Sequence, residues 1–557
     1  MNLKSRIVER GKQLVQSPRV MRWVSDDRVM KAAEGVLDAR SRVKLAWRML
    51  TNGHELPNID PALDESIGHT LNGNTNGHAR ANGSANGAAV NGSGVNGSAK
   101  NGHARASISA LDVEEQQPAA KKNGNGHSQH VDEYEEGTAN NAMERSLRER
   151  ANLANIAGQD VFEKCYQFKT ADNARKVGMY PFFRPLDFND GPEAEIDGRR
   201  VVMFGSNNYL GLTTHPKVRQ AAKDAIDRFG TSMTGSRLVN GSMKLHNEFE
   251  AKLATYFNKE AALVFTTGYQ VNLATCAALL SNKKTVAVID RSVHASLYDG
   301  VRLGQAAGTR LVRYKHSDPD SLEAALSKLE PDEGAFVITD GVFSAEGEIA
   351  PLDKIVPIVK KYKARLLVDD AHALGVIGPG GRGTAYAFGL EDQVDLIGGT
   401  FSKSMASIGG YLVGERKVLD YIQHFAPSFM FAASAAPPSV AAAMAAFDVM
   451  QEEPWRMDKL RENFTFMRDK LRDMGFELGH TETAVIPIYI RSDLRTLMMW
   501  KELLEVHGVY TNPFISPGVP PKSARLRTSY MATHERVHLE RGLDAIYKAG
   551  KKFGVIK

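Results

Sequence analysis

The chain has 557 residues, 42% of them hydrophobic and 24% charged, so it can bury a normal core and has room for several domains. The formal net charge is only +5, and the sequence has neither zinc-finger spacing nor an aromatic-basic pattern, which excludes nucleic acid as the expected partner. Two cysteines, Cys165 and Cys276, make no disulfide framework, and no apolar run approaches the roughly 18 residues that cross a bilayer, so a soluble cytoplasmic protein is predicted.

Residues 1–55 are predicted to be a basic amphipathic helical segment. The first 50 residues carry 12 Lys or Arg against 5 Asp or Glu, a local charge of +7, and apolar residues such as Trp23 and Trp47 interrupt the basic ones. One interpretation is peripheral contact of residues 1–50 with the inner membrane face or with an acidic partner, since a basic face with tryptophan suits such an interface. The other is a small helical appendage with a solvated basic face.

Residues 56–142 are predicted to be a disordered linker rich in Asn-Gly. The dipeptide recurs between residues 72 and 102, but no alternating apolar strands flank it, so hairpins are not expected. A segment with so few apolar residues cannot offset the entropy of ordering its backbone. We therefore expect a tether between the basic segment and the rest of the chain.

Residues 143–200 are predicted to be an N-terminal arm, helical from Met143 to about Lys169, and residues 201–425 a large domain. A short strand at 201–204 is followed by apolar runs that alternate with helical stretches, which favours an α/β fold with a mostly parallel sheet. The expected strands are Ala261–Phe265, Thr285–Ile289, Arg310–Tyr314, Gly334–Thr339, Arg365–Val368 and Val394–Ile397. Residues 426–557, with helices near 438–475, 494–508 and 533–552 and a strand at 484–490, are predicted to form a smaller α+β domain.

Lys403 is the first candidate for chemistry. A single lysine is usually a solvated surface charge, but this one follows an apolar run and stands among Gly, Ser and Thr in Gly398–Ser404. Small residues let a planar cofactor approach the backbone, and hydroxyl groups can bind its phosphate. A desolvated lysine has a depressed pKa and therefore a usable free amine. The context predicts a Schiff-base lysine for pyridoxal 5'-phosphate.

Further candidates follow other strands. Asp369 ends an apolar run, where ligands bind in parallel sheets, and can keep a pyridinium nitrogen protonated. His372 can donate to the ring oxygen, although an N-cap aspartate with an incidental histidine would give the same spacing. His294 follows another strand and could stack on the cofactor. Gly268 and Tyr269 open a helix after a strand, which is an anion site suited to phosphate. No metal site is predicted.

Ordered sequence blocks from about residue 200 to 555 resemble the α-oxoamine synthases, pyridoxal-phosphate enzymes of fold type I. The blocks include Gly205–Leu212, Thr234–Gly241 with His246, Thr267–Tyr269, Ser292–Ser296, Asp340–Gly347 and the blocks around Asp369 and Lys403. The resemblance implies a large, mostly parallel-sheet domain, a smaller C-terminal domain and a homodimer.

The resemblance also implies roles for individual residues. Catalytic roles would belong to Lys403, His294, Asp369 and His372. Cofactor contacts would add Gly268, Tyr269, Ser344, Thr400 and, reaching the neighbouring subunit's phosphate, Ser434. The substrate would be held by Arg527, whose guanidinium suits a carboxylate, together with Asn208 and His294.

Within the family, Thr400–Ser404 most resembles the soluble bacterial members that condense L-serine with a long-chain acyl thioester to a 3-keto long-chain base. Met405-Ala406 and Asp370 depart from that pattern, and the resemblance leaves the acyl length and the donor, acyl-CoA or acyl-carrier protein, open. One alternative is a relative that uses glycine or alanine. A second alternative is a non-catalytic regulatory subunit, although retention of Lys403, Asp369 and His372 argues against it. A third is an interaction protein in which the basic segment matters most.

Overall fold

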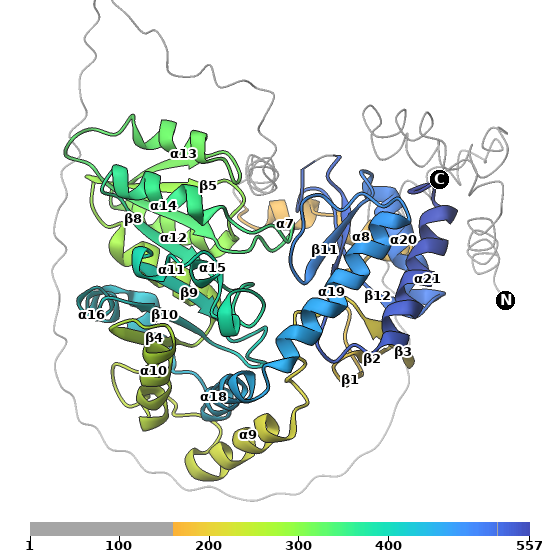
Figure 1. The fold of residues 1–557 in the computed structure, drawn as a ribbon, viewed down its shortest axis with the longest axis horizontal. Coiled ribbons are helices and arrows are strands. Elements are labelled where there is room, and N and C mark those ends of the chain that lie inside the picture. The colour runs from red at the N-terminus through yellow and green to blue at the C-terminus, as the bar shows by residue number, and fades with distance from the viewer. Residues whose placement is uncertain (1–159, 521) are drawn as a thin grey trace, which may run out of the picture. The chain divides into compact units, whose positions relative to one another are not determined.

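The computed structural model describes residues 160–520 and 522–557, which belong to one compact unit (Figure 1). The predicted segments 1–55 and 56–142 lie outside the described residues, as does most of the helix predicted from Met143. In the part of the chain that is described, no helix has the length and apolar character needed to span a membrane.

The N-terminal arm has two short helices where one continuous helix through Lys169 was predicted. These are α7 (Glu163–Gln167) and α8 (Thr170–Lys176). The first helix ends within two residues of the predicted end, because Phe168 has an extended backbone, with ψ of 94°, whereas α8 was not predicted. Neither helix buries a residue that would stabilise a longer one. A small sheet follows, in the order β1-β2-β3-β12. Its strands are β1 (Phe188–Asn189), β2 (Glu193–Ile196), β3 (Arg199–Met203) and β12 (Val509–Tyr510).

The central sheet has seven strands in the order β4-β10-β9-β8-β7-β5-β6. All neighbouring pairs are parallel except those made by β10, which lies antiparallel between β4 and β9. The strands are β4 (Ala261–Phe265), β5 (Thr285–Asp290), β6 (Arg310–Tyr314), β7 (Gly334–Asp340), β8 (Arg365–Asp369), β9 (Leu396–Thr400) and β10 (Gly410–Gly414). This sheet agrees with the predicted α/β fold class, although β10 was not predicted and β9 begins two residues later than expected.

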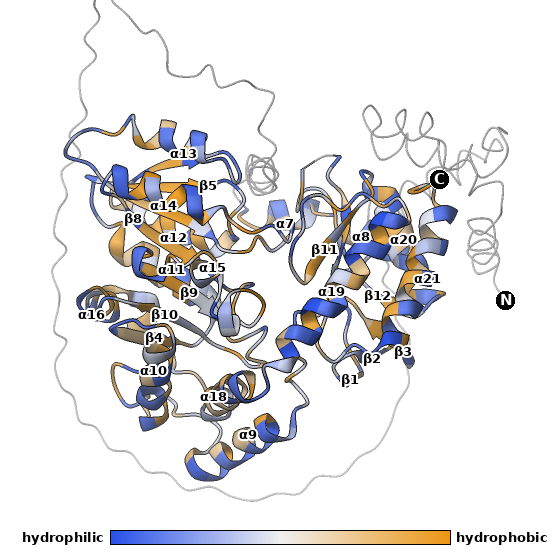
Figure 2. Cartoon of the chain, in the orientation of Figure 1, coloured by the Kyte–Doolittle hydropathy of each residue, from blue (hydrophilic) through white to orange (hydrophobic). Residues whose placement is uncertain are grey.

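Helices cover the central sheet on both faces, as expected where the strands are apolar along their whole length (Figure 2). They include α10 (Lys244–Tyr256), α11 (Gly268–Leu279), α12 (Ala295–Ala306), α13 (Pro319–Leu326), α14 (Leu352–Lys361) and α16 (Arg416–Phe425). The other helices of this part are α9 (Pro216–Phe229), which packs on α18 (Pro437–Glu452), and the short α15 (Thr384–Ala387) and α17 (Pro427–Met430), with 3₁₀ turns at Pro379–Gly381 and Glu391–Gln393. Every residue of β4, β9 and β10 is buried.

The C-terminal part packs helices on a three-stranded antiparallel sheet in the order β11-β14-β13. Its elements are α19 (Trp455–Asp473), β11 (Val485–Tyr489), α20 (Asp493–Glu505), β13 (Asn512–Phe514), β14 (Arg525–Ser529) and α21 (Arg536–Lys552). Strand β14 was not predicted, and it carries Arg527. The predicted boundary at residue 425 stays a prediction.

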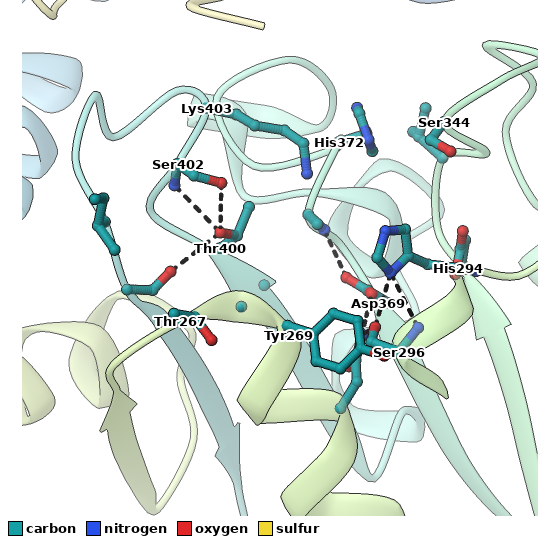
Figure 3. Close-up of a pocket in the computed structure, with 18 residues that line it drawn as sticks. Thr267, Tyr269, His294, Ser296, Ser344, Asp369, His372, Thr400, Ser402 and Lys403 are labelled. Carbon is teal, nitrogen blue, oxygen red and sulfur yellow. Dashed lines mark hydrogen bonds between the residues drawn. The ribbon is translucent and has the colours of Figure 1, made fainter. Parts of the chain in front are cut away.

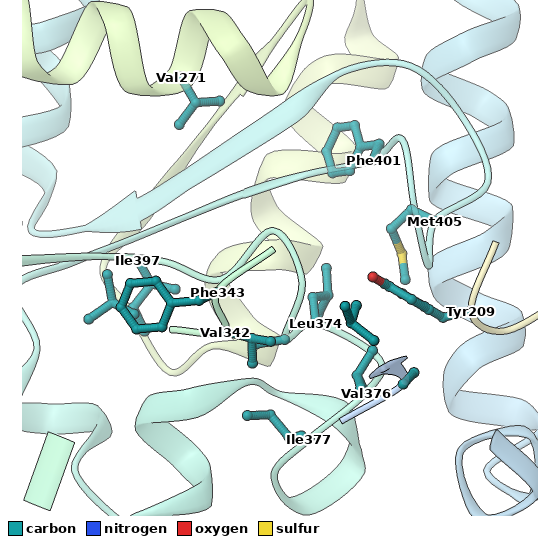
Figure 4. Close-up of a cluster of buried hydrophobic side chains, with 14 of the residues drawn as sticks. Tyr209, Val271, Val342, Phe343, Leu374, Val376, Ile377, Ile397, Phe401 and Met405 are labelled. Carbon is teal, nitrogen blue, oxygen red and sulfur yellow. The ribbon is translucent and has the colours of Figure 1, made fainter. Parts of the chain in front are cut away.

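An apolar cluster lies beneath the segments that follow β7, β8 and β9 (Figure 4). Phe343, Leu374, Phe401 and Met405 belong to it, and each is almost fully buried. Because a close-packed core resists displacement, the polar residues next to these side chains in sequence are held on a rigid base. Those neighbours include Ser344, His372 and Lys403.

Candidate active site

A cavity of about 270 Å³ lies at the carboxyl ends of β5, β7, β8 and β9 (Figure 3). Asp340, Asp369 and Thr400 are the last residues of β7, β8 and β9, and His294 follows β5 by four residues. This is the position where parallel α/β sheets bind ligands. The structure brings eight of the predicted site residues to the cavity wall: Gly268, Tyr269, His294, Ser344, Asp369, His372, Thr400 and Lys403.

Lys403 extends into the cavity from the turn that joins β9 to β10 (Figure 3). The turn is closed by a hydrogen bond from the Phe401 amide to the Gly409 carbonyl, at 2.9 Å, and Thr400 Oγ1 donates to the same carbonyl at 3.0 Å. Gly409 has φ of 134°, which a side chain would strain. Burial lowers the pKa of the Lys403 amine to about 8; Asp369 opposes this shift and Arg527 adds to it. The unprotonated fraction of this amine near neutral pH is therefore larger than for an ordinary lysine, and it becomes the main form only above about pH 8.

Asp369 is buried, and each of its carboxylate oxygens accepts one hydrogen bond. Its Oδ2 accepts from Asn272 Nδ2 at 2.6 Å, and its Oδ1 accepts from the Ala371 amide at 2.9 Å. Asn272 also donates to Ser296 Oγ at 2.9 Å, so α11 and α12 fix the carboxylate together. These donors fix the orientation of the Asp369 carboxyl group at the cavity wall.

His372 is paired with Tyr209, whose hydroxyl lies 2.7 Å from His372 Nδ1. Burial raises the pKa of Tyr209 to about 12, so its hydroxyl keeps its proton. Burial lowers the pKa of His372 well below its usual value, with Lys403 and Arg527 acting in the same direction. A neutral imidazole that accepts from Tyr209 at Nδ1 carries its proton on Nε2, where it can donate to a ligand.

His294 is the N-cap of α12. Its Nδ1 lies 2.8 Å from Ser296 Oγ, and its backbone amide donates to Asp340 Oδ1 at 3.3 Å. Burial and Lys403 lower the pKa of His294, against the opposite effect of Asp369. Burial and Asp369 raise the pKa of Asp340 well above its usual value. Ser296 thus holds the ring of His294 at the cavity wall, and Asp340 holds its backbone.

The amino end of α11 forms the wall beside Thr400. A Cβ added to Gly268 would lie 2.6 Å from Thr400 Cβ, so only glycine permits this approach of helix and strand. Thr400 Oγ1 also lies 2.8 Å from Ser402 Oγ. Backbone amides at a helix start and neighbouring hydroxyl groups are suited to bind a phosphate. Tyr269 lies at the cavity mouth, where its hydroxyl donates to Asp299.

Arg527 lines a second cavity of about 470 Å³, which shares His294, Ser344, His372 and Lys403 with the first. Its Nε donates to the Ser344 carbonyl at 2.6 Å, and its Nη1 donates to Asn207 Oδ1 at 3.0 Å and Ser529 Oγ at 2.7 Å. Arg527 is only 3% exposed, yet its Nη2 has no hydrogen-bond partner among the described residues. A buried, charged donor of this kind is suited to a carboxylate.

Two predicted site residues lie elsewhere. Asn208 was assigned to the substrate, but its Nδ2 donates to Thr213 Oγ1 at 2.8 Å and its Oδ1 accepts from the Leu212 amide at 3.0 Å. Its side chain therefore closes a local turn, and the neighbouring Asn207 lines the cavity instead. Ser434 lines a separate small cavity with Thr266, and its buried hydroxyl has no partner among the described residues.

Several residues of the site were missed by sequence reasoning. Asn272 could have been identified because it is an amide within a mostly apolar helix. Asp340 could have been identified because it ends a buried strand, as Asp369 does. Nothing in the sequence indicated that Tyr209 lies against His372, 163 residues away. In the described ranges, no group of three or more His, Cys, Asp or Glu is arranged to hold a metal ion.

Residues 199–546 match the family model described as aminotransferase class I and II. The chain is 42% identical over 390 residues to a serine palmitoyltransferase of Sphingobacterium spiritivorum, covering 70% of this chain and 96% of that protein. It is 39% identical over 385 residues to 8-amino-7-oxononanoate synthase 1 of Bacillus velezensis, covering 69% and 97%.

Solved structures with a similar fold include serine palmitoyltransferases. Serine palmitoyltransferase of Sphingomonas wittichii superposes with a TM-score of 0.68 at 33% identity, covering 72% of this chain and all of that one. A high-resolution structure of SPT with a PLP internal aldimine gives a TM-score of 0.69 at 32% identity, with the same coverage.

Proposed function

The chain belongs to the α-oxoamine synthases, a family of pyridoxal-phosphate enzymes, and from this membership we propose that it is a serine palmitoyltransferase-like acyltransferase. The proposed reaction joins L-serine to a long-chain acyl thioester, such as palmitoyl-CoA, and releases the thiol and carbon dioxide. The product is a 3-keto long-chain base, the first intermediate of sphingolipid synthesis.

The residues of the first cavity fit pyridoxal phosphate. An amine of lowered pKa, an engaged carboxylate and a neutral imidazole converge on one space, and Gly268 leaves room beside Thr400. In the proposed arrangement Lys403 would bond to the aldehyde, Asp369 would pair with the ring nitrogen, and His372 would donate to the ring oxygen. The phosphate is held by the start of α11 with Tyr269, by Thr400 and, across a subunit boundary, by Ser434. When bound, the cofactor accepts the electron pair left at the substrate Cα.

Arg527 is the residue that supports an amino acid as the substrate. Its buried Nη2 donor lacks a partner among the described residues, and it lies in a cavity that also contains Lys403 and His294. We propose that this donor binds the carboxylate of serine, with Asn207 and Ser344 fixing the guanidinium plane. Because the same carboxyl group is later lost as carbon dioxide, its position also sets which bond of Cα faces the cofactor.

Lys403 then moves the proton in the proposed mechanism. Once the amino group of serine has replaced the Lys403 nitrogen at the aldehyde, the released amine, whose pKa burial lowers to about 8, would remove the proton from the serine Cα. A new carbon–carbon bond forms between Cα and the acyl carbonyl carbon, and the thiolate leaves. Loss of carbon dioxide follows, and Lys403 returns a proton to Cα. His294 lines the cavity on the side where it can orient the serine carboxylate.

The second cavity supplies an apolar wall for the acyl group. Six aromatic and proline residues are among those that line it: Pro181, Phe182, Phe183, Tyr510, Pro513 and Phe514. Burial of methylene groups against such a surface is worth about 0.8 kcal/mol each, which favours a long acyl chain over a short one. Phe183 is 92% exposed, so part of this wall is open in the single chain.

We further propose that the enzyme acts as a homodimer. Three apolar side chains are exposed, Val239 at 79%, Ile408 at 61% and Phe431 at 72%, and Ile408 lines the cavity. A second copy covering this region would also bring a ligand to the unpartnered hydroxyl of Ser434. Sedimentation velocity should show a dimer for the wild type and a shift toward monomer for Val239→Asp.

Mass analysis of products tests the proposed activity. The purified protein is mixed with L-serine, glycine or L-alanine and with acyl thioesters of CoA or acyl-carrier protein of increasing chain length. Serine with a C16 thioester should give the mass of the 3-keto base. A product only with glycine or alanine would instead support another α-oxoamine synthase, the alternative favoured by the 39% identity to 8-amino-7-oxononanoate synthase 1.

The proposed location is the cytoplasm, with peripheral contact at the inner membrane face through residues 1–50. Their excess of basic residues supports this proposal. Flotation with vesicles containing anionic lipid, with and without residues 1–130, tests it. Equal recovery of both proteins in the lipid fraction would contradict it.

A further inference from the structure

His316 lies between two carboxylates in the segment that follows β6. Its Nδ1 is 3.2 Å from Asp290 Oδ1, and its Nε2 is 3.2 Å from Glu348 Oε2. An ionised carboxylate only accepts hydrogen bonds, so both ring nitrogens must donate and the ring is an imidazolium. Burial alone would lower its pKa, but the hydrogen bonds to Asp290 and Glu348 outweigh that effect and raise it to about 10. The bridge is thus charged at physiological pH.

The Asp290 side of this bridge organises the loop that carries His294. Asp290 is the last residue of β5 and is fully buried. Its Oδ1 also accepts from the Ser292 amide at 2.8 Å, and its Oδ2 accepts from the Ser317 amide at 2.8 Å. Ser317 has φ of 49°, an uncommon value that persists where surrounding contacts enforce it. The carboxylate therefore joins the His316 segment to the start of the His294 loop.

The Glu348 side of the bridge belongs to the turn at residues 343–348. The Phe343 amide donates to the Glu348 carbonyl at 2.9 Å, and the Gly347 amide donates to the Phe343 carbonyl at 2.8 Å. The His316 ring meets the Phe343 ring edge-on, with centroids 4.3 Å apart. Ser344 lies in this turn, and its carbonyl accepts from Arg527 Nε at 2.6 Å. The same turn thus supports the guanidinium.

The opposite side of the turn is attached to β14. Arg525, two residues before Arg527, pairs with Glu346 at 3.1 Å and donates to the Ala345 carbonyl at 3.2 Å. His316 and β14 therefore hold the 343–348 turn from two sides. Figure 3 places Ser344 and His294 on adjacent segments, across the cavity from Thr400 and Ser402.

We propose that His316 is a positioning residue for the amino-acid substrate, which fixes the loop of His294 relative to the turn that holds Arg527. This proposal rests on the proposed function, because it takes the cavity between those two residues as the amino-acid site. His316 itself lines neither cavity, so its effect is indirect. An error of about 1 Å in the relative position of two substrate contacts can cost on the order of a hundredfold in rate.

Four variants test the proposal in the full-length holoenzyme. His316→Gln leaves two carboxylates with one amide donor between them. Glu348→Ala removes one end of the bridge, whereas Glu348→Gln keeps an oxygen that accepts from Nε2. The matched control is His507→Gln, since His507 also pairs with a carboxylate, Glu502 at 3.7 Å, outside both cavities.

We expect His316→Gln and Glu348→Ala to raise the serine KM at least tenfold and to lower kcat by a smaller factor. Glu348→Gln should stay within about threefold of the wild type, and His507→Gln should not change. The dissociation constant for serine, measured by calorimetry, should rise with KM, while the visible absorption of bound cofactor and its retention on dialysis should stay as in the wild type. That combination separates positioning from a general loss of structure.

The proposal is overturned if His316→Gln and Glu348→Ala bind serine as tightly as the wild type does, or if serine and cofactor binding fall together. Should His316→Gln fail to fold, the serine KM and dissociation constant of Glu348→Ala, compared with those of Glu348→Gln, still test the proposal. Failure of the proposed function has a different signature, since the wild type itself would then give no product with serine. The binding measurement would in that case be repeated with the amino acid that the wild type accepts.

Discussion

Substitution of Arg527 by lysine is the sharpest test of the carboxylate site. The guanidinium uses Nε and Nη1 for Ser344, Asn207 and Ser529, which leaves Nη2 as the donor for a ligand. Lysine keeps the positive charge but has no planar fork, so it cannot hold these partners and a carboxylate together. A hydrogen bond to a charged group contributes about 1.5–3 kcal/mol, and 1.4 kcal/mol is a factor of ten. The serine KM should therefore rise roughly 10- to 150-fold.

The assay for this variant follows initial rates over a range of serine concentrations at a fixed, saturating acyl thioester. Arg456→Lys is the matched control, because Arg456 is also a buried arginine, 7% exposed, and donates to the Leu210 carbonyl and Glu453 away from both cavities. Its serine KM should stay within twofold of the wild type. An unchanged serine KM in Arg527→Lys, with cofactor bound normally, would remove Arg527 from the carboxylate site.

The remaining predictions concern Lys403 and Asp369. Lys403→Ala should lose the visible absorption of the lysine-bound cofactor, and its turnover should fall at least 10³-fold. The substitution removes the amine that bonds to the cofactor and takes the proton from the serine Cα. An active alanine variant would contradict the mechanism. In the wild type, kcat should rise with pH as the Lys403 amine loses its proton, with the midpoint of the rise at or above pH 8. A kcat that stays constant from pH 6 to 9 would contradict the role of Lys403 as the base. Asn272→Ala removes the 2.6 Å hydrogen bond to Asp369 and should weaken cofactor retention on dialysis about tenfold, whereas equal retention would show that Ala371 alone suffices.

The sequence predicted most strands of the central sheet because strands buried on both faces, such as β5 and β7, are continuous apolar runs. Two strands, Ala261–Phe265 and Arg310–Tyr314, have the predicted bounds. Strand β10 was missed because Gly409 and Gly410 at its start are typical of a turn, although here they allow close approach to Phe401 and Gly268. Strand β14 was missed because Arg525 and Arg527 interrupt its apolar pattern. Both arginines are nevertheless buried, since Arg525 pairs with Glu346 and Arg527 donates to the Ser344 carbonyl, contacts that a sequence does not reveal.

The site was predictable where strand ends bring residues together. Asp369 and His294 follow parallel strands, and the sheet places them on one edge without further information. Pairs formed across the chain were not predictable, such as Tyr209 with His372 or Asn207 with Arg527, 320 residues apart. The wrong placement of Asn208 has the same origin, since adjacent residues point in different directions and only the backbone of the turn decides which one faces the cavity.

Arg527 links substrate binding to the strength of the base. Its positive charge contributes to the lowered pKa of Lys403, and burial and Asp369 are the other influences on that amine. A serine carboxylate bound to Arg527 would neutralise this charge, so the pKa of Lys403 should rise once the substrate is in place. A higher pKa makes the unprotonated amine a stronger base, although a smaller fraction is unprotonated. The limb of the kcat profile, which reports the substrate complex, should thus lie above the value of about 8 in the ligand-free chain.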